Sequence, residues 1–298
     1  MSALRSRPAG GEAGIARLGS FAGSTPNIQL TTPNNPDPFG VGDWELRFDS
    51  SVTRRTLKLT LAYDGTRLVG WQRQAEGDSV QGLLEDALAR FEGASVTVHG
   101  AGRTDAGVHA LGQVASAIVS FEHDVTTLQR ALNAHLPPDI RVLSVVDADP
   151  EFHARFSARG KTYQYRIRNT PVADPFERAY VWHVPEPLDL GAMERAAAAL
   201  VGTHDFIAFQ SVGSETSGTT RTITRSSWRG TGGLFTYEIA GDGFLRHMVR
   251  AIVGTLVEVG RGWREPDNVV ALLEPRTRAE AGATAPANGL FLVCVDYH

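Results

Sequence analysis

The feature of the sequence that most limits the fold is a repeated order of hydrophobic patterns. Residues 57–63 alternate apolar with polar or small side chains, which is typical of a half-buried strand. From 80 to 91 the apolar residues instead recur every three or four positions, as on one face of a helix. Two strands around a glycine-rich loop follow, then a second helix over 128–136 and a strand over 140–146. This half of the chain therefore reads strand, helix, strand, strand, helix, strand.

The second half of the chain repeats that order. We expect a strand, an alanine-rich helix, a hairpin, a strongly apolar helix and a last buried strand, over 162–168, 191–201, 222–239, 245–259 and 290–295. Strand–helix–strand–strand–helix–strand is the split βαβ pattern of ferredoxin-like folds. The sequence therefore predicts an α+β protein with two ferredoxin-like domains, one over 53–152 and one over 153–298.

Residues 1–52 differ from the rest because they are rich in proline and glycine and lack sustained periodicity. We interpret them as a poorly ordered N-terminal extension. Arg5 and Arg7 are not followed by a hydrophobic core, so a secretory signal is not expected. No apolar run approaches the roughly 18 residues that a membrane span requires, which makes a cytoplasmic location without a membrane partner the default expectation.

Charge and cysteine content exclude several classes of function. The 29 Lys+Arg and 33 Asp+Glu residues give a net charge of −4, which by itself argues against a nucleic-acid partner. The single cysteine, Cys294, excludes an internal disulfide and any multi-cysteine metal site. The nine histidines show no close paired-ligand spacing, so no metal site is predicted. Of the basic residues only Lys58 and Lys161 are lysines, and arginine suits two-pronged contacts with phosphate or carboxylate.

The first candidate site is the glycine-rich segment from His99 to His109, which contains Arg103 and Asp105. Glycine permits tight turns and close approach of a bulky ligand, and an aspartate two residues from an arginine would stay ionised and face that ligand. The alternative is a structural turn in which Asp105 caps its own backbone.

The second candidate site runs from His153 to Arg168 and carries five positive charges and no acid. These are Arg155, Arg159, Lys161, Arg166 and Arg168. Tyr163 and Tyr165 are two apart and share one face of the expected strand. Cations interleaved with aromatic rings suit phosphate contacts and base stacking, whereas the alternative is a solvated edge strand whose aromatics cover the core.

A third candidate is the apolar helix over 245–259, in which Arg246 and Arg250 share a face. An arginine in so apolar a helix needs a carboxylate or phosphate partner. The alternative is an internal ion pair that only joins the two domains. Arg221, Arg225 and Arg229 recur every four residues, so we expect them on one solvated side of a hairpin strand.

These motifs identify a family. From about Leu57 to Tyr297 the sequence closely resembles the bacterial tRNA pseudouridine synthase A family. The resemblance rests on Tyr63-Asp-Gly65, Gly70-Trp-Gln-Arg-Gln74, Ala101-Gly-Arg-Thr-Asp-Ala-Gly-Val-His109, Phe152-His-Ala-Arg-Phe156 and Arg246-His-Met-Val-Arg-Ala-Ile-Val-Gly254.

The resemblance implies an isomerase that converts uridine to pseudouridine at positions 38 to 40 in the anticodon stem-loop of tRNA. It also implies a homodimer, a basic active-site cleft between the sheets and no cofactor. Asp105 matches the family's nucleophile, Arg103 its loop arginine, Tyr163 the tyrosine that packs on the target base, and Arg250 the arginine that pairs with the nucleophile. We expect Tyr163, Arg103, Arg246, Arg155, Arg159 and Lys161 to bind the substrate.

Two other functions compete with this one. A non-catalytic RNA-binding protein could share the fold, but it would not need a carboxylate in a site for an anionic ligand. A glycosidase-like hydrolase would need a second acid near Asp105, and no other motif supplies one.

Overall fold

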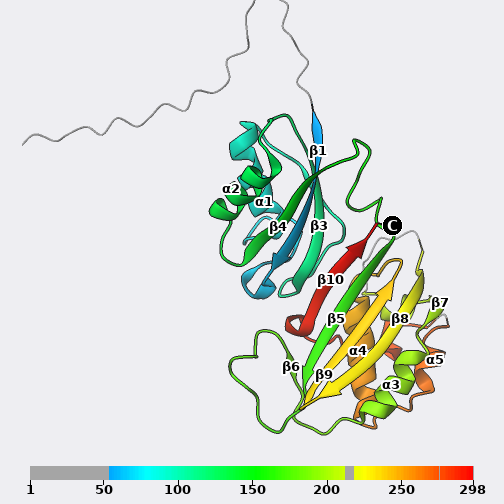
Figure 1. Cartoon of the computed structure of the whole chain (residues 1–298). Helices are drawn as coiled ribbons and strands as arrows, with labels where there is room; N and C mark the ends of the chain where they lie inside the picture. Colours follow the sequence, from blue (N-terminus) through cyan, green and yellow to red (C-terminus); the bar gives the residue numbers. More distant parts are fainter. Residues whose placement is uncertain (1–53, 212–217, 275, 298) are drawn as a thin grey trace, which may run out of the picture. The chain divides into compact units, whose positions relative to one another are not determined.

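The computed structural model describes residues 54–211, 218–274 and 276–297. The N-terminal extension predicted for residues 1–52 lies outside these residues. The described chain is α+β, and its ten strands form one sheet in which the order of the main path is β4-β1-β3-β10-β5-β9-β8-β7 (Figure 1).

The N-terminal half of the sheet is antiparallel, with β1 between β3 and β4 and with β2 on the other side of β3. Its elements are β1 (Arg55–Tyr63), α1 (Val80–Glu92), β2 (Val98–Gly100), β3 (His109–Val119), α2 (Val125–His135) and β4 (Ile140–Ala148). The order of elements that the hydrophobic pattern predicts for this half is therefore present.

The C-terminal half of the sheet is antiparallel along β10, β5, β9, β8 and β7, and β6 pairs with β5 in parallel. Its elements are β5 (Gly160–Arg168), β6 (Trp182–His183), α3 (Leu190–Ala198), β7 (Gly202–Asp205), β8 (Thr220–Thr231), β9 (Leu234–Gly241), α4 (Met248–Gly260), α5 (Asn268–Ala271) and β10 (Leu290–Asp296). The last strand, β10, joins the halves because it also pairs in parallel with the start of β3.

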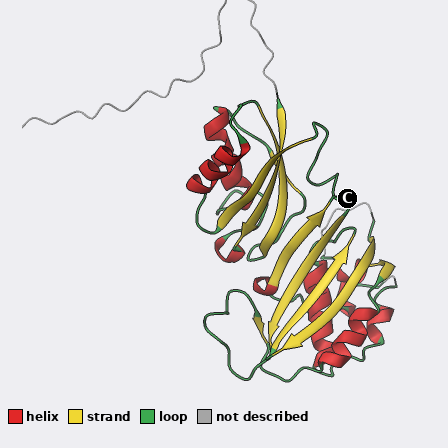
Figure 2. Ribbon diagram, in the orientation of Figure 1, coloured by secondary structure: helices red, strands yellow, loops and turns green. Residues whose placement is uncertain are grey.

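The helices gather in two groups, one beside each half of the sheet (Figure 2). The side chains of Ser79, Asp124 and Asp189 cap α1, α2 and α3 by accepting hydrogen bonds from backbone N–H groups in the first turn. None of the helices in the described ranges is long and apolar enough to cross a membrane.

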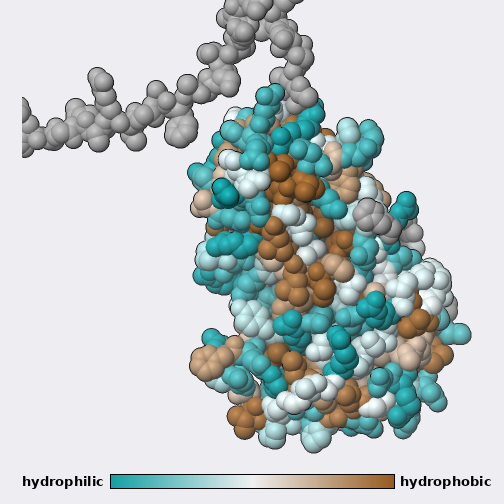
Figure 3. Space-filling model, viewed as in Figure 1, coloured by the Kyte–Doolittle hydropathy of each residue, from teal (hydrophilic) through white to brown (hydrophobic). Residues whose placement is uncertain are grey.

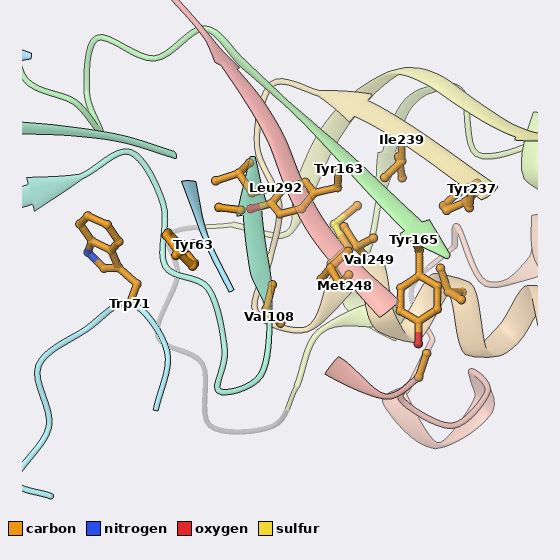
Figure 4. Packing of buried hydrophobic residues seen from close by; sticks show 14 of the residues in the cluster. Tyr63, Trp71, Val108, Tyr163, Tyr165, Tyr237, Ile239, Met248, Val249 and Leu292 are labelled. Carbon is orange, nitrogen blue, oxygen red and sulfur yellow. The ribbon is translucent and has the colours of Figure 1, made fainter. Parts of the chain in front are cut away.

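Helix α4 is the most buried helix, since 11 of its 13 residues are buried. A helix that is apolar on all sides belongs inside a protein, where each large aliphatic side chain contributes about 1.5–3 kcal/mol by leaving water. Arg250 and Glu258 are its only partly exposed residues. Figure 4 shows the neighbouring core, in which Met248 and Val249 of α4 lie near Tyr163 of β5.

The arginines of β8 do not share one side of the strand, so that expectation was wrong. A register shift between Ile223 and Arg225 marks a β-bulge. Side chains alternate with a period of two, so an extra residue moves everything beyond it to the opposite face. Arg221 therefore lies on the face of buried Ile223, whereas Arg225 and Arg229 lie on the other.

Candidate active site

Polar side chains of β1 and β3 hold the glycine-rich loop between β2 and β3 in place. The hydroxyls of Tyr63 and Thr104 are hydrogen bonded at 2.8 Å, and the Gln113 amide donates to the Gly102 carbonyl at 2.8 Å. Burial raises the pKa of Tyr63 to about 12, although its hydrogen bonds to Thr104 and Gln113 oppose the shift. Buried, fully paired polar groups of this kind hold a loop in one conformation.

The turn that carries Asp105 is also fixed at the backbone. The Trp71 N–H donates to the Thr104 carbonyl at 3.0 Å, and the Val108 N–H donates to the Asp105 carbonyl at 3.1 Å. Gly107 takes a φ of 79°, which glycine alone adopts at no steric cost in such a turn. Among the described residues Asp105 does not cap its own backbone with its side chain; the carboxylate turns toward α4 instead.

Arg250 pairs directly with Asp105. Its Nη1 donates to Asp105 Oδ2 at 2.9 Å across 145 residues of sequence, while its Nε donates to the Ala285 carbonyl at 2.7 Å. The second bond orients the guanidinium, because the donors of arginine form a rigid fork. The Asp105 side chain nevertheless remains 28% exposed, so the carboxylate is both charge-paired and accessible.

His247 approaches the other carboxylate oxygen, with its Nε2 3.3 Å from Asp105 Oδ1. Its Nδ1 is hydrogen bonded to the Ser211 hydroxyl. Burial lowers the pKa of His247, and the charges of Arg250, Arg246 and Arg278 lower it further, against the opposing effect of Asp105. The backbone here has φ 63°, the one positive φ among the non-glycine residues described.

Tyr163 lies in the core beneath this pair. Its ring is 7% exposed and packs edge-on against Phe244, with centroids 5.0 Å apart. Burial raises the pKa of Tyr163 far above its usual range, and the charges of Tyr63 and Asp105 add to the effect. The phenol therefore keeps its proton, and it lies close enough to Asp105 to sense the carboxylate. Tyr165 shares this buried face, as predicted.

Lys161 connects the basic segment to the loop. A Cβ placed on Gly102 would lie 3.2 Å from Lys161 Cε, so the lysine stem packs against the loop backbone. Burial lowers the pKa of Lys161, and the charges of Arg155 and Arg221 lower it further, while Asp242 opposes them. A lysine close to two arginines at a loop of this kind is favourable for an anionic ligand.

The remaining arginines fall into two groups. Arg103, Arg155, Arg159 and Arg246 are exposed and form no ion pair with the part of the chain that the structure describes. Others are already occupied: Arg168 pairs with Glu177, and Arg225 and Arg229 both pair with Glu238. Arg166 lies over the Phe291 ring at 4.1 Å. Within the candidate segments, the first group therefore has no carboxylate among the described residues that competes with an anionic ligand.

Three residues of this site were not singled out from the sequence. His247 could have been suspected because an imidazole flanked by arginines is unusual in an apolar helix. Tyr63 lies in the Tyr-Asp-Gly motif but reads locally as a core residue. Gln113 gave a weak signal as a polar residue within an apolar strand, and it is fully buried. No group of three metal-ligating side chains occurs within the described residues.

Comparison with known proteins connects this geometry to one family. Residues 60–157 and 196–298 match the family described as tRNA pseudouridine synthase. A protein of Moorella thermoacetica named tRNA pseudouridine synthase A is 48% identical over 243 residues, covering 81% of this chain and 99% of its own. Proteins of the same name from Pelobacter propionicus and Myxococcus xanthus are 46% and 45% identical, covering 82% and 81% of this chain and 100% and 91% of their own.

Proposed function

The chain belongs to the tRNA pseudouridine synthase family, and we propose that it isomerises uridine to pseudouridine at positions 38 to 40 of the tRNA anticodon stem-loop. One observation carries the proposal beyond family membership: an accessible carboxylate, Asp105, is paired with Arg250 on a rigid loop beside unpaired cations. A protein that only binds RNA gains nothing from a carboxylate at that place, because it repels phosphate.

The reaction that we propose involves no net oxidation or reduction and no net gain or loss of atoms, because substrate and product are isomers. The N1–C1′ glycosidic bond of uridine breaks, a C5–C1′ bond forms, the C5 proton leaves and N1 gains a proton. Asp105 acts as the nucleophile and traps an electron-poor carbon of the ribose or the uracil as a covalent ester until the base has turned. Arg250 stabilises the carboxylate charge and sets its direction.

The other residues prepare the base. A uridine must leave its stack before any group can reach its reactive atoms. In this proposal Tyr163 packs against the extruded uracil, and its protonated hydroxyl takes part in the proton transfer at the carbon C5. Arg103, which extends from the same loop as Asp105, fills the vacated position or binds a phosphate. Arg246, Arg155, Arg159 and Lys161 bind further phosphates.

We also propose that the chain is divided into two domains. The order β4-β1-β3-β2 and the order β10-β5-β9-β8 are equivalent in the two halves of the sheet, which supports two ferredoxin-like domains over 53–152 and 153–298. We place the substrate in a basic cleft that these domains flank, and the protein in the cytoplasm.

The protein also acts as a homodimer in this proposal. Figure 3 shows apolar side chains gathered on one face of the protein, over the strands of the N-terminal half. The exposed large hydrophobic residues Leu111, Ile118, Leu143 and Val146 belong to β3 and β4. Apolar side chains on an exposed sheet face favour burial against another chain.

The test is the release of tritium from tRNA that carries 5-tritiated uridine, followed by mapping of the modified positions. We expect the wild-type protein to release tritium, and Asp105→Asn or Asp105→Ala to release none while binding tRNA nearly as well. Turnover by either variant would show that Asp105 is not the nucleophile. Binding without any release by the wild type would favour the RNA-binding alternative.

A further inference from the structure

A cluster of aromatic rings joins β2, which leads into the glycine-rich loop, to the turn before β5. Phe156 is 77% exposed, and the His153 ring lies against its ring with centroids 4.4 Å apart. The His99 ring also lies against His153, with centroids 4.7 Å apart. We call His99, His153 and Phe156 the aromatic step. None of these three residues has a part in the proposed reaction.

The aromatic step is held rigidly. His153 Nδ1 accepts hydrogen bonds from the backbone N–H groups of Arg155 and Phe156, which fixes the ring against the turn. Ala154, in the middle of the turn, is fully buried; its N–H donates to the Ser116 hydroxyl and its carbonyl accepts from the Tyr297 hydroxyl. The exposure of Phe156 is therefore built into the turn.

The surroundings of the aromatic step are positive. The Arg155 guanidinium lies 5.6 Å from the centre of the Phe156 ring. No acidic residue occurs from 153 to 168, and Lys161 packs against Gly102 of the catalytic loop. His99 is six residues before Asp105, which corresponds to at most about 22 Å of extended chain. The step therefore lies within a few nucleotides of the proposed reaction centre.

We propose that Phe156 is a stacking platform for an unpaired nucleobase of the RNA, next to the target uridine. An exposed ring beside the Arg155 guanidinium fits a base and its phosphate, because every base has a face for stacking and every nucleotide carries a charge. His153 and His99 support the Phe156 ring from behind, while Arg155 and Lys161 bind the phosphates. The inference rests on the proposed function, since it concerns the same substrate.

The experiment measures binding of an anticodon stem-loop RNA to Phe156→Ala, Phe156→Leu and Phe156→Trp, each in the Asp105→Asn background to prevent turnover. Loss of one stacked base weakens binding by about 5- to 100-fold, which we expect for Phe156→Ala and in part for Phe156→Leu. Phe156→Trp retains the affinity because tryptophan offers a larger face. Replacing single bases of the RNA by abasic sites then locates the partner: the matching abasic RNA should bind wild type and Phe156→Ala equally.

Phe176 provides the matched control. Its ring is 89% exposed, but it lies between Asp174 and Glu177, and its N–H donates to the Asp174 carboxylate. Phe176→Ala should leave RNA binding unchanged because its surroundings repel phosphate.

The outcomes separate this inference from the proposed function. If Phe156→Ala binds RNA as tightly as the parent while the wild type still makes pseudouridine, the platform is refuted and the function stands. If Phe156→Ala instead lowers the association state in sedimentation at equal RNA affinity, Phe156 contacts a second copy and the platform is again refuted. If the wild type makes no pseudouridine, the proposed function itself fails.

Discussion

Asp105 is approached by two nitrogen groups that differ in charge. Arg250 is cationic, whereas burial, more than any other cause, lowers the pKa of His247 and so favours its uncharged ring. A second cation at 3.3 Å would stabilise the carboxylate further and reduce its reactivity in the nucleophilic role that we propose for it. The combination leaves one charge to pair with Asp105 and one neutral ring to limit its movement.

His247 provides a test at this scale because its backbone is left-handed. Both His247→Ala and His247→Gly remove the ring, but only alanine still bears the steric cost of a positive φ. The free energy of unfolding of His247→Gly should therefore be about 1–2 kcal/mol higher than that of His247→Ala. Both variants should turn over more slowly than the wild type at similar RNA affinity, since the ring orients Asp105. Urea unfolding and single-turnover kinetics measure these effects; equal stability of the two variants would contradict the backbone argument.

The same histidine sets a pH dependence. A lowered pKa means that the unfolded chain takes up a proton near pH 6.5 while the folded protein does not, so stability falls as the pH drops below 6.5. Burial also lowers the pKa of His109 and His153, which contribute in the same direction. Replacing His247 should therefore reduce this loss of stability between pH 7 and pH 5 without abolishing it.

At the scale of single residues, the sequence indicates which residues are candidates for the site but not which of them are in contact. Asp105 and Arg250 stand out locally as charges among glycine and apolar residues, yet their separation of 145 residues hides the pairing from any local pattern. The resemblance to the tRNA pseudouridine synthase A family supplied this pairing. The left-handed backbone of His247 could not be predicted either, because histidine is only moderately enriched in that conformation and occurs far more often in others.

At the scale of elements, hydrophobic periodicity predicted the long helices and strands because each buries one face. It missed β6, β7 and α5, which have two to four residues and are too short to show a period. It began α4 at Leu245 because that residue is apolar and fits the helical spacing, although Leu245 belongs to the preceding turn, where its carbonyl accepts from the Met248 N–H. The bulge in β8 was equally invisible, since one extra residue leaves composition unchanged.

The connection between β1 and α1 gives a test of how an element supports the site. Gly70 has φ 104°, and a Cβ there would lie 2.6 Å from the Thr104 carbonyl oxygen and 3.0 Å from the Asp105 carbonyl carbon. Gly70→Ala should cost about 2–4 kcal/mol of stability from strain and overlap, and should displace the loop and lower kcat.

Gly93 is the matched control, with φ 71° and no atom within 4 Å of its would-be Cβ. Gly93→Ala should cost about 1 kcal/mol from backbone strain alone and leave kcat unchanged. Urea denaturation and tritium release measure both variants. A Gly70→Ala protein with wild-type kcat would show that the loop does not depend on this contact.

At the scale of the whole molecule, the net charge of −4 conceals how the arginines are used. A count of charges along the sequence treats all arginines alike, but Glu177 pairs with Arg168, and Glu238 pairs with Arg225 and Arg229. Among the candidate substrate-binding residues, Arg103 on the glycine-rich loop and Arg155 and Arg159 on the segment that leads into β5 have no carboxylate partner in the described ranges. Local field, rather than net charge, decides where a polyanion binds.

The salt dependence of tRNA affinity tests whether net charge or local charge governs binding. Arg159→Gln and Arg229→Gln change the net charge equally, so a difference between them reports local charge. Each phosphate contact releases counterions, so losing one should reduce the slope of log affinity against log salt by about 0.7–0.9. We expect that change for Arg159, which has no ion pair in the described ranges, and none for Arg229, whose removal leaves Glu238 paired with Arg225. The measurement is tRNA affinity over a series of salt concentrations in the Asp105→Asn background. Equal changes in both variants would mean that net charge governs binding and that the ion pairs do not decide which arginines contact tRNA.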